Sequence, residues 1–326
     1  MQDRCAFMHR CMNMKIFDLH ADIGMDVLSK KLKGEQDILK TYHLDKLELG
    51  DILGVGMACF FEGHENWQTA QTMVRALREE LEMNQARLHF YKGGSLSENC
   101  LNAMITIEGM CFIEKEPEAH LTWLYEQGAR IGSLCWNDEN ALATGVKGNS
   151  LRGLSTLGKR AIQHMNRLNM IIDVSHTNEK SFWDVLETSS KPVIATHSNT
   201  RHLSNVDRNL TEQQIKALIQ KEGLIGLVAA RWFVSKDESN QTANQLALHA
   251  AHIKALGGID HLAIGFDYMD FLEGNYGRAS MASDLQDASE SQNLIQALRN
   301  VGFSEEEIKK VAWDNVKSFL YKHLSG

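Results

Sequence analysis

The sequence predicts an α/β fold, a (β/α)₈ barrel of the TIM type with additional C-terminal helices. Eight short apolar runs alternate with helical patterns, and most of the runs are continuously apolar, as in strands buried on both faces of a parallel sheet. Eight such repeats in about 250 residues are typical of this barrel. A doubly wound open sheet would usually carry a glycine-rich phosphate loop after an early strand, and the sequence has none there.

The predicted strands and helices follow one another in order along the chain. The strands are 15–20, 54–61, 102–109, 129–136, 170–176, 192–198, 224–230 and 261–267. The helices between them are 67–91, 118–127, 156–168, 179–188, 211–222 and 240–256. Thr211 and Gln214 predict a capping box, whereas Gly223 and Gly257 predict helix ends. Residues 284–326 predict two more amphipathic helices that pack on the barrel.

Composition limits the possible partners. Lys and Arg total 34 against 42 Asp and Glu, a formal charge of −8, which argues against nucleic acid as a partner. Six cysteines without paired spacing indicate reduced thiols, and no apolar run approaches the length of a membrane span. Residues 1–13 lack the apolar core of a secretory signal, and we expect them to be a disordered extension. We therefore expect one cytoplasmic domain over 1–326 without membrane contact.

The first strand ends in a pair of metal-ligand types. The run KIFDLHAD (15–22) carries His20 and Asp22, and side chains at i and i+2 of a strand point to the same side. Both could therefore bind one ion, although such a pair often arises by chance. Its meaning depends on what the other strand ends carry.

Other predicted strands end in residues of the same kinds. Each has a structural alternative: a buried arginine could pair with Glu108, His176 and His197 could be core or capping residues, and Asp267 could cap a loop. In a parallel barrel, however, all these strand ends meet at one face. Three histidines and three carboxylates at that face are the composition of a two-metal hydrolytic site.

With these residues in place, the chain resembles the membrane (renal) dipeptidase family of zinc peptidases, which includes soluble bacterial members and has an amidohydrolase-type barrel. The resemblance runs from about Phe17 to Leu320. The matching segments are FDLHAD, HLDKLELGDILGVGMACFF, ITIEG, GLSTLGKRAIQHMNRLNMIIDVSH, PVIATHS, VDRNLT, HLAIGFD and SEEEIKKVAWDNVKSFL.

The resemblance implies a centre of two Zn²⁺ ions per chain. His20 and Asp22 would bind the first ion, Glu108 would bridge both, and His176 and His197 would hold the second. The same ligands would also take Mn²⁺ or Co²⁺. Such an ion pair would lower the pKa of a shared water and so supply a hydroxide for attack on the peptide carbonyl.

The resemblance also assigns residues to the substrate. Arg208, which could otherwise be a surface ion-pairing residue, matches the arginine that holds the terminal carboxylate, and its planar fork suits that task. Asp267 matches the catalytic aspartate associated with the attacking water and the substrate amine. The implied substrates are small dipeptides, including those with a C-terminal D-residue, and the implied assembly is a homodimer.

Two positions depart from the family pattern. Trp136 stands where many members carry a histidine that polarises the carbonyl, and an indole N–H can donate one hydrogen bond but cannot carry charge. Asn137 and Asn140 lie nearby, and we expect Trp136 and Asn137 to contact substrate. Asp270 stands in FDYMDF, where a more compact ending would be expected, and its role is open.

Three functional hypotheses follow. The first is a zinc dipeptidase. The second, prompted by Trp136, is a related amidohydrolase acting on N-acyl amino acids or lactones. The third is a catalytically inactive barrel that serves as a binding protein, against which the complete ligand set argues.

Overall fold

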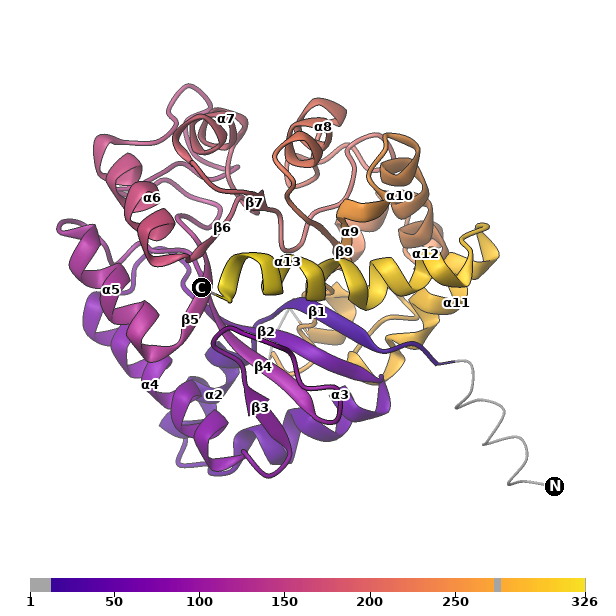
Figure 1. Ribbon diagram of the computed structural model, residues 1–326, viewed down its shortest axis with the longest axis horizontal. Coiled ribbons are helices and arrows are strands. Elements are labelled where there is room, and N and C mark those ends of the chain that lie inside the picture. The colour runs from indigo at the N-terminus through magenta and orange to yellow at the C-terminus, as the bar shows by residue number, and fades with distance from the viewer. Residues whose placement is uncertain (1–12, 273–276, 326) are drawn as a thin grey trace.

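Eight parallel strands form a barrel in the computed structural model, which describes residues 13–272 and 277–325 (Figure 1). The barrel strands are β1 (Ile16–Ala21), β2 (Ile52–Phe60), β4 (Leu101–Glu108), β5 (Ala129–Ser133), β6 (Ile171–Asp173), β7 (Val193–Ile194), β8 (Ile225–Leu227) and β9 (Leu262–Ile264). Their order is β7-β6-β5-β4-β2-β1-β9-β8, and a parallel bridge between Ala195 and Ile225 joins the two ends. Each predicted strand overlaps one of these elements, and the predicted fold class is confirmed.

Most helices pack outside the strands, as predicted. They are α4 (Trp67–Met83), α5 (Pro117–Gln127), α6 (Thr156–Leu168), α7 (Glu179–Thr188), α8 (Glu212–Gln220) and α10 (Ala243–Ala255). The capping box of Thr211 and Gln214 is present at the start of α8. The C-terminal segment forms α11 (Gln292–Asn300), α12 (Glu305–Lys309), the π-helical turn η6 (Lys310–Asp314) and α13 (Asn315–Leu324).

The predicted helix over 67–91 is wrong in its last part. Helix α4 ends at Met83, where the Asn84 side chain donates to the Glu80 carbonyl at 2.9 Å. The chain then forms the short strand β3 (Leu88–Phe90), which pairs with β4 outside the barrel. Apolar spacing over three residues fits a helix as well as a strand, so only the pairing with β4 distinguishes the two.

Several short elements were not predicted. They are α2 (Ile23–Leu32), the π-helical turn η1 (Leu39–His43), α3 (Leu44–Leu49), α9 (Arg231–Val234) and the 3₁₀ turns η2 (Glu238–Asn240), η3 (Ile259–His261), η4 (Gly277–Ser280) and η5 (Ala288–Glu290). Helix α2 begins directly after Asp22, so β1 and α2 together fix the position of that carboxylate.

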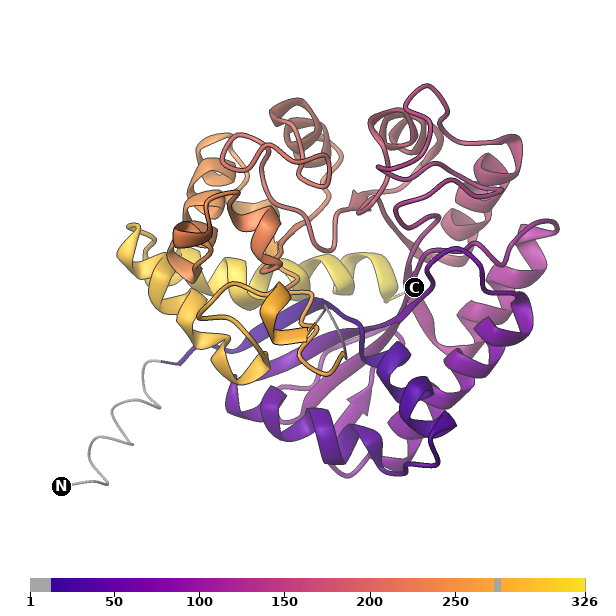
Figure 2. The same cartoon turned by 180° about the vertical axis from the view of Figure 1, so that it is seen from behind.

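Helix α13 lies across the barrel end that faces the viewer in Figure 1, and the opposite end faces the viewer in Figure 2. Trp313 of η6 and Val316, Phe319 and Leu320 of α13 form one apolar cluster with barrel residues such as Phe17. The Phe17 and Trp313 ring centroids are 6.0 Å apart. The C-terminal helices therefore seal this end of the barrel.

Two further observations bear on the sequence predictions. In 13–272 and 277–325, no helix combines the length and the apolar character that crossing a bilayer requires. Cys59, Cys100, Cys111 and Cys135 are free thiols. The predicted disordered extension, 1–13, lies outside the described residues except for Asn13.

Candidate metal centre

All the predicted metal ligands converge at the C-terminal ends of the barrel strands. His20 and Asp22 lie at the end of β1, Glu108 is the last residue of β4, and His176 and His197 follow β6 and β7. None of these side chains is more than a tenth exposed. The structure therefore brings together residues that are up to 177 positions apart in the chain (197 − 20).

The first half of the cluster surrounds His20. Its Nε2 atom lies 3.2 Å from Glu108 Oε2, 3.4 Å from Asp22 Oδ1 and 3.8 Å from Asp267 Oδ1. A neutral imidazole donates one proton at most, so it cannot satisfy three carboxylates. Asp22 Oδ1 is buried without a hydrogen-bond partner among the described residues, which leaves it available to a cation.

The second half surrounds the other oxygen of Glu108. Glu108 Oε1 lies 2.7 Å from His176 Nε2 and 3.4 Å from His197 Nε2, and the two Nε2 atoms are 2.9 Å apart. Two imidazole nitrogens and a carboxylate oxygen are ligand types that zinc and related ions accept. The two oxygens of Glu108 thus face two separate groups of ligands, which fits a bridging role.

Burial governs the protonation of these groups. Burial raises the pKa of Glu108 to about 7. Burial and then the Asp22 carboxylate raise the pKa of Asp267 well above its usual range. Burial alone would lower the pKa of His20, but Glu108 and Asp22 raise it well above 6.5. The carboxylates therefore need a cation or a proton nearby to remain buried at low cost.

The other two histidines stay neutral. Burial, followed by the charges of Arg208 and His20, lowers the pKa of His176 and His197 well below 6.5. A histidine must be neutral to offer a nitrogen lone pair to a metal. The electrostatics of the second half therefore fit a divalent cation, and in the first half such a cation would take the place of the proton that Glu108 and Asp22 favour on His20.

Hydrogen bonds behind the histidines fix which nitrogen faces the centre. The Thr196 hydroxyl donates to Asp173 Oδ2 at 2.6 Å, so its oxygen accepts from His197 Nδ1 at 2.7 Å. Asn137 Oδ1 accepts from His176 Nδ1 at 3.0 Å. Both histidines therefore present the Nε2 lone pair to Glu108, an arrangement typical of metal-binding histidines.

Three of the supporting residues were not singled out from the sequence. Asp173 and Thr196 orient His197, whereas Asp18 Oδ1 accepts from the backbone N–H groups of His20 and Phe266 at 3.2 and 2.9 Å. Asp18 thereby links β1 to the chain after β9. Asp18 and Asp173 could have been found from the sequence, because each is a carboxylate inside an apolar strand run. Asp18 lies two residues before His20, and Asp173 lies three residues before His176.

The backbone adopts unusual conformations where the strands end. His176 and Asp267 have φ angles of 70° and 61°, in the left-handed region that non-glycine residues rarely occupy. Gly109, with φ 78°, turns the chain directly after Glu108, and a Cβ there would lie 2.8 Å from the Phe61 carbonyl oxygen. Such strain is common where a fold must aim a functional side chain.

Arg208 lies beside the second half of the cluster. Its Nη1 donates to Ser198 Oγ at 3.1 Å and its Nη2 donates to the His197 carbonyl at 2.9 Å. Its Nε is buried without a hydrogen-bond partner in the described part of the chain. Burial lowers the pKa of Arg208 from its usual value. The guanidinium is therefore positioned by the strand end and keeps a donor free for a ligand.

Trp136 lies at the edge of the cluster. Its ring centroid is 5.9 Å from that of His176 and 5.0 Å, edge to face, from that of Phe60. Asn137 contacts His176 from behind, so direct contact between Asn137 and substrate stays a prediction. The Asn140 side chain is occupied within its own loop, where it donates to the Leu134 carbonyl and accepts from the Leu142 and Ala143 N–H groups.

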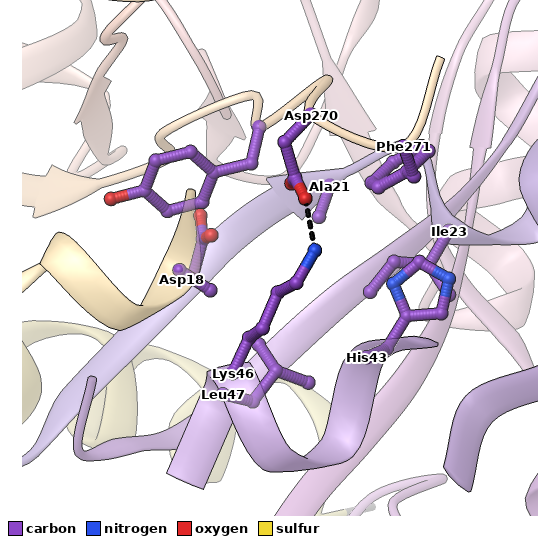
Figure 3. A pocket seen from close by; sticks show the side chains of 10 residues that line it. Asp18, Ala21, Ile23, His43, Lys46, Leu47, Asp270 and Phe271 are labelled. Carbon is purple, nitrogen blue, oxygen red and sulfur yellow. Dashed lines mark hydrogen bonds and ion pairs between the residues drawn. The ribbon is translucent and has the colours of Figure 1, made fainter. Parts of the chain in front are cut away.

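Asp270, whose role the sequence left open, pairs with Lys46 of α3 (Figure 3). The two residues line a small cavity together with Asp18, His43 and Phe271. His43 in turn contacts Asp26 at 2.8 Å. Asp270 therefore anchors the segment after Asp267 to α3, and it belongs to none of the groups of possible metal ligands in the described residues.

Comparisons with known proteins identify the family. The family model for membrane dipeptidase (Peptidase family M19) matches residues 6–320. An uncharacterized protein in the pqqA 5′ region of Klebsiella pneumoniae is 32% identical over 200 residues, which cover 59% of this chain and 71% of that protein. Dipeptidase tcpJ of Claviceps purpurea is 33% identical over 164 residues, 50% of this chain and 37% of that protein.

A solved structure shares the fold. The metallo peptidase from Rhodobacter sphaeroides, liganded with a phosphinate mimic of the dipeptide L-Ala-D-Ala, superposes with a TM-score of 0.83 at 21% identity, covering 96% of this chain and 99% of that one. The family model confirms the resemblance and the enzyme class predicted from the sequence. The chain belongs to the membrane dipeptidase family, Peptidase family M19, and is a metallo-dipeptidase of that family.

Proposed function

We propose that this enzyme hydrolyses small dipeptides, including those with a C-terminal D-residue, at a centre of two Zn²⁺ ions. The two-ion proposal rests on the two carboxylate oxygens of Glu108, which face different histidines. Oε2 lies 3.2 Å from His20 Nε2, and Oε1 lies 2.7 Å from His176 Nε2. His20 and Asp22 would hold one ion, and His176 and His197 would hold the other. Mn²⁺ and Co²⁺ are alternatives because they accept the same nitrogen and oxygen ligands.

When bound, such an ion pair supplies a water of lowered pKa and polarises the peptide carbonyl. The residues of the chain do the rest. Asp267 is proposed to accept a proton from the attacking water and to deliver it to the departing amine nitrogen, and its position beside the cluster, with Oδ1 3.8 Å from His20 Nε2, supports this role. Asn137 and Thr196 keep both second-half histidines in the tautomer that leaves Nε2 free.

Arg208 is proposed to bind the substrate's terminal carboxylate. Its free Nε and the remaining Nη protons offer a planar fork, and the protein bonds to Ser198 and His197 hold that fork still. A single carboxylate anchor beside the reacting centre would restrict the substrate to short peptides. The D-residue proposal is supported by the dipeptide mimic bound to the Rhodobacter protein.

Trp136 supports a second candidate. The family histidine that it replaces would polarise the carbonyl, whereas an indole offers one neutral N–H donor. An enzyme with that change could act instead on N-acyl amino acids or lactones, which share the carbonyl and, in the acyl compounds, the carboxylate. Trp136 is proposed to contact the substrate in either case.

One substrate panel tests both candidates. Purified protein would be reconstituted with Zn²⁺, Mn²⁺ or Co²⁺, its metal content measured by mass spectrometry, and turnover followed on L,L- and L,D-dipeptides, N-acetyl amino acids and a lactone. We expect two ions per chain and turnover of dipeptides. Activity on acyl compounds or lactones alone would select the second candidate, and a metal-loaded protein without any turnover would revive the inactive barrel.

A conservative variant tests the proposed carboxylate anchor. Arg208→Lys keeps the charge but loses the fork, so we expect kcat/KM on a dipeptide to fall about 10²-fold, as expected for a lost charge-assisted pair. The matched control is the corresponding dipeptide amide, which lacks the carboxylate and whose turnover should fall much less. An equal loss on both substrates would contradict the anchor.

Three broader expectations remain part of the proposal. They are a single domain over 1–326, a homodimer and a cytoplasmic location. Light scattering on the purified protein would measure the assembly directly.

A further inference from the structure

A second group of possible metal ligands lies outside the catalytic centre. It consists of His202, in the loop after β7, Glu212, the first residue of α8, and His252 of α10. One ligand atom from each lies within 4.8 Å of the others. Glu212 Oε1 is 3.3 Å from His252 Nε2 and 3.9 Å from His202 Nδ1.

The polar atoms of this cluster are incompletely satisfied. His252 Nε2 is buried, and no hydrogen bond of good geometry reaches it from 13–272 or 277–325. The two oxygens of Glu212 have different neighbours. Lys216 Nζ lies 3.7 Å from Oε2, whereas His202 and His252 both lie near Oε1. A buried ring nitrogen beside a carboxylate oxygen suits an ion between them.

The separations fit a transition-metal ion. An ion bound tetrahedrally at about 2.0–2.2 Å holds its ligand atoms roughly 3.3–3.6 Å apart, which lies close to the two distances from Glu212 Oε1. The two imidazole rings are stacked, with centroids 4.2 Å apart and planes 4° from parallel. Their lone pairs therefore converge only if one ring turns, and the His202 side chain, which is 58% exposed, has room to do so.

We propose that His202, Glu212 and His252 bind one transition-metal ion of the Zn²⁺ class, separate from the catalytic pair. Two imidazoles and one carboxylate favour such an ion over Ca²⁺ or Mg²⁺, which prefer oxygen ligands. Solvent completes the coordination, because Glu212 and His202 are on the surface. The proposal is independent of the proposed dipeptide chemistry.

The position of the site suggests what the ion does. His202 lies six residues before Arg208, in a loop where the Arg201 N–H donates to the Leu210 carbonyl. Helix α10 already holds this loop through His249, whose Nδ1 accepts from the Thr200 N–H at 3.2 Å. An ion on His202, Glu212 and His252 adds an attachment of the same loop to α8 and α10, and so stiffens the segment that carries Arg208.

The test counts ions in the full-length protein. Wild type, His202→Ala, His252→Ala and His64→Ala would be equilibrated by dialysis against the same buffered free Zn²⁺ and their bound zinc measured. His64 is the matched control. It is exposed and its Nε2 lies 3.7 Å from Glu65 Oε1, but it belongs to none of the groups of possible metal ligands in the described chain. We expect His202→Ala and His252→Ala to hold one ion fewer per chain than wild type and His64→Ala.

A second measurement covers the case in which His252→Ala disturbs packing. On addition of Zn²⁺, hydrogen exchange of the 199–210 amides should slow more in wild type and in His64→Ala than in His202→Ala, whose truncation removes a mostly exposed side chain. Equal zinc content in wild type and His202→Ala would overturn the proposal, as would an equal loss of zinc in His64→Ala. Since all four proteins keep the catalytic ligands, these outcomes are read as differences and do not depend on how many ions the catalytic centre holds.

Discussion

The two ends of the barrel are filled in opposite ways. At the end formed by the C-terminal ends of the strands, three carboxylates lie within 3.8 Å of His20 Nε2. In the described chain, none of the three forms an ion pair with a lysine or arginine. At the other end, Phe17 packs against Trp313 in an apolar cluster sealed by α13. Burying apolar surface stabilises a fold, whereas burying charge without a counter-ion costs stability. The apolar end therefore stabilises the fold, whereas the buried carboxylates at the other end cost stability that a nearby cation or proton would offset.

The largest effect should come from Glu108→Gln. The amide keeps the shape but loses the charge and one acceptor oxygen, so we expect turnover to fall about 10³–10⁴-fold, equivalent to roughly 4–5.5 kcal/mol in the activation barrier. Bound metal, measured by mass spectrometry, should fall as well. Because burial raises the pKa of Glu108 from 4.5 to about 7, its ionisation costs stability as pH rises between these values, and the full cost remains at pH 8. In EDTA at pH 8 the variant should then unfold at no lower urea concentration than wild type. A clear loss of stability would contradict the view that the buried Glu108 charge destabilises the metal-free protein.

At the opposite end, we expect Trp313→Ala to lower stability and to leave metal binding unchanged. Trp313 is 4% exposed, and its removal leaves a cavity against Phe17, so we expect the free energy of unfolding to fall by about 3–4 kcal/mol. Urea unfolding at pH 7 measures the loss. The folded variant should keep the wild-type number of bound ions, and a variant that folds but binds no metal would show that the two ends are not separable.

A smaller effect is expected from pH at the catalytic end. His249 of α10 is fully buried, with Nδ1 accepting from the Thr200 N–H and Nε2 donating to the Val234 carbonyl, and burial lowers its pKa to about 4. The unfolded chain binds this proton near pH 6.5, so stability is lost as pH falls from about 6.5 toward 4. At pH 5 the loss is about 2 kcal/mol for a shift of this size.

The contribution of His249 is isolated in metal-free protein. Urea unfolding of wild type and His249→Gln in EDTA at pH 7 and pH 5 would be compared, since metal loss at low pH then plays no part. His249→Gln should be less stable at pH 7 and should lose about 2 kcal/mol less than wild type on going to pH 5. An identical pH dependence in the two proteins would exclude His249 as the source.

The smallest effect is predicted for the ion pair between Lys46 and Asp270. Lys46 is 37% exposed, so solvent screens the pair, and we expect Asp270→Asn to lower the free energy of unfolding by at most about 1 kcal/mol. Because Asp270 anchors the segment after Asp267 without joining the ligand cluster, kcat/KM should change less than about threefold, well under the 10² expected for a lost catalytic donor. A loss as large as that of Glu108→Gln would place Asp270 in the catalytic machinery.

Local pattern predicted much of this molecule. The eight strands were found because each is a short apolar run that tolerates little else when both faces are buried. The grouping of five side chains was predicted because a polar side chain at the end of such a run points to one shared face of a barrel, and the structure brings these side chains together: His20, Asp22, Glu108, His176 and His197. The wrong helix boundary at Met83 and the missed strand β3 mark the limit, since three residues carry too little periodicity.

What the sequence by itself determined is therefore the barrel and the polar residue types at the C-terminal ends of its strands. Only the tertiary structure decided which oxygen of Glu108 faces which histidines, that Thr196 with Asp173 orients His197, and that Asp270 pairs with Lys46. It also assembled the cluster of His202, Glu212 and His252 from three separate segments. These contacts depend on the register and packing of elements distant in the chain, and residue spacing along one strand or helix carries no information about them.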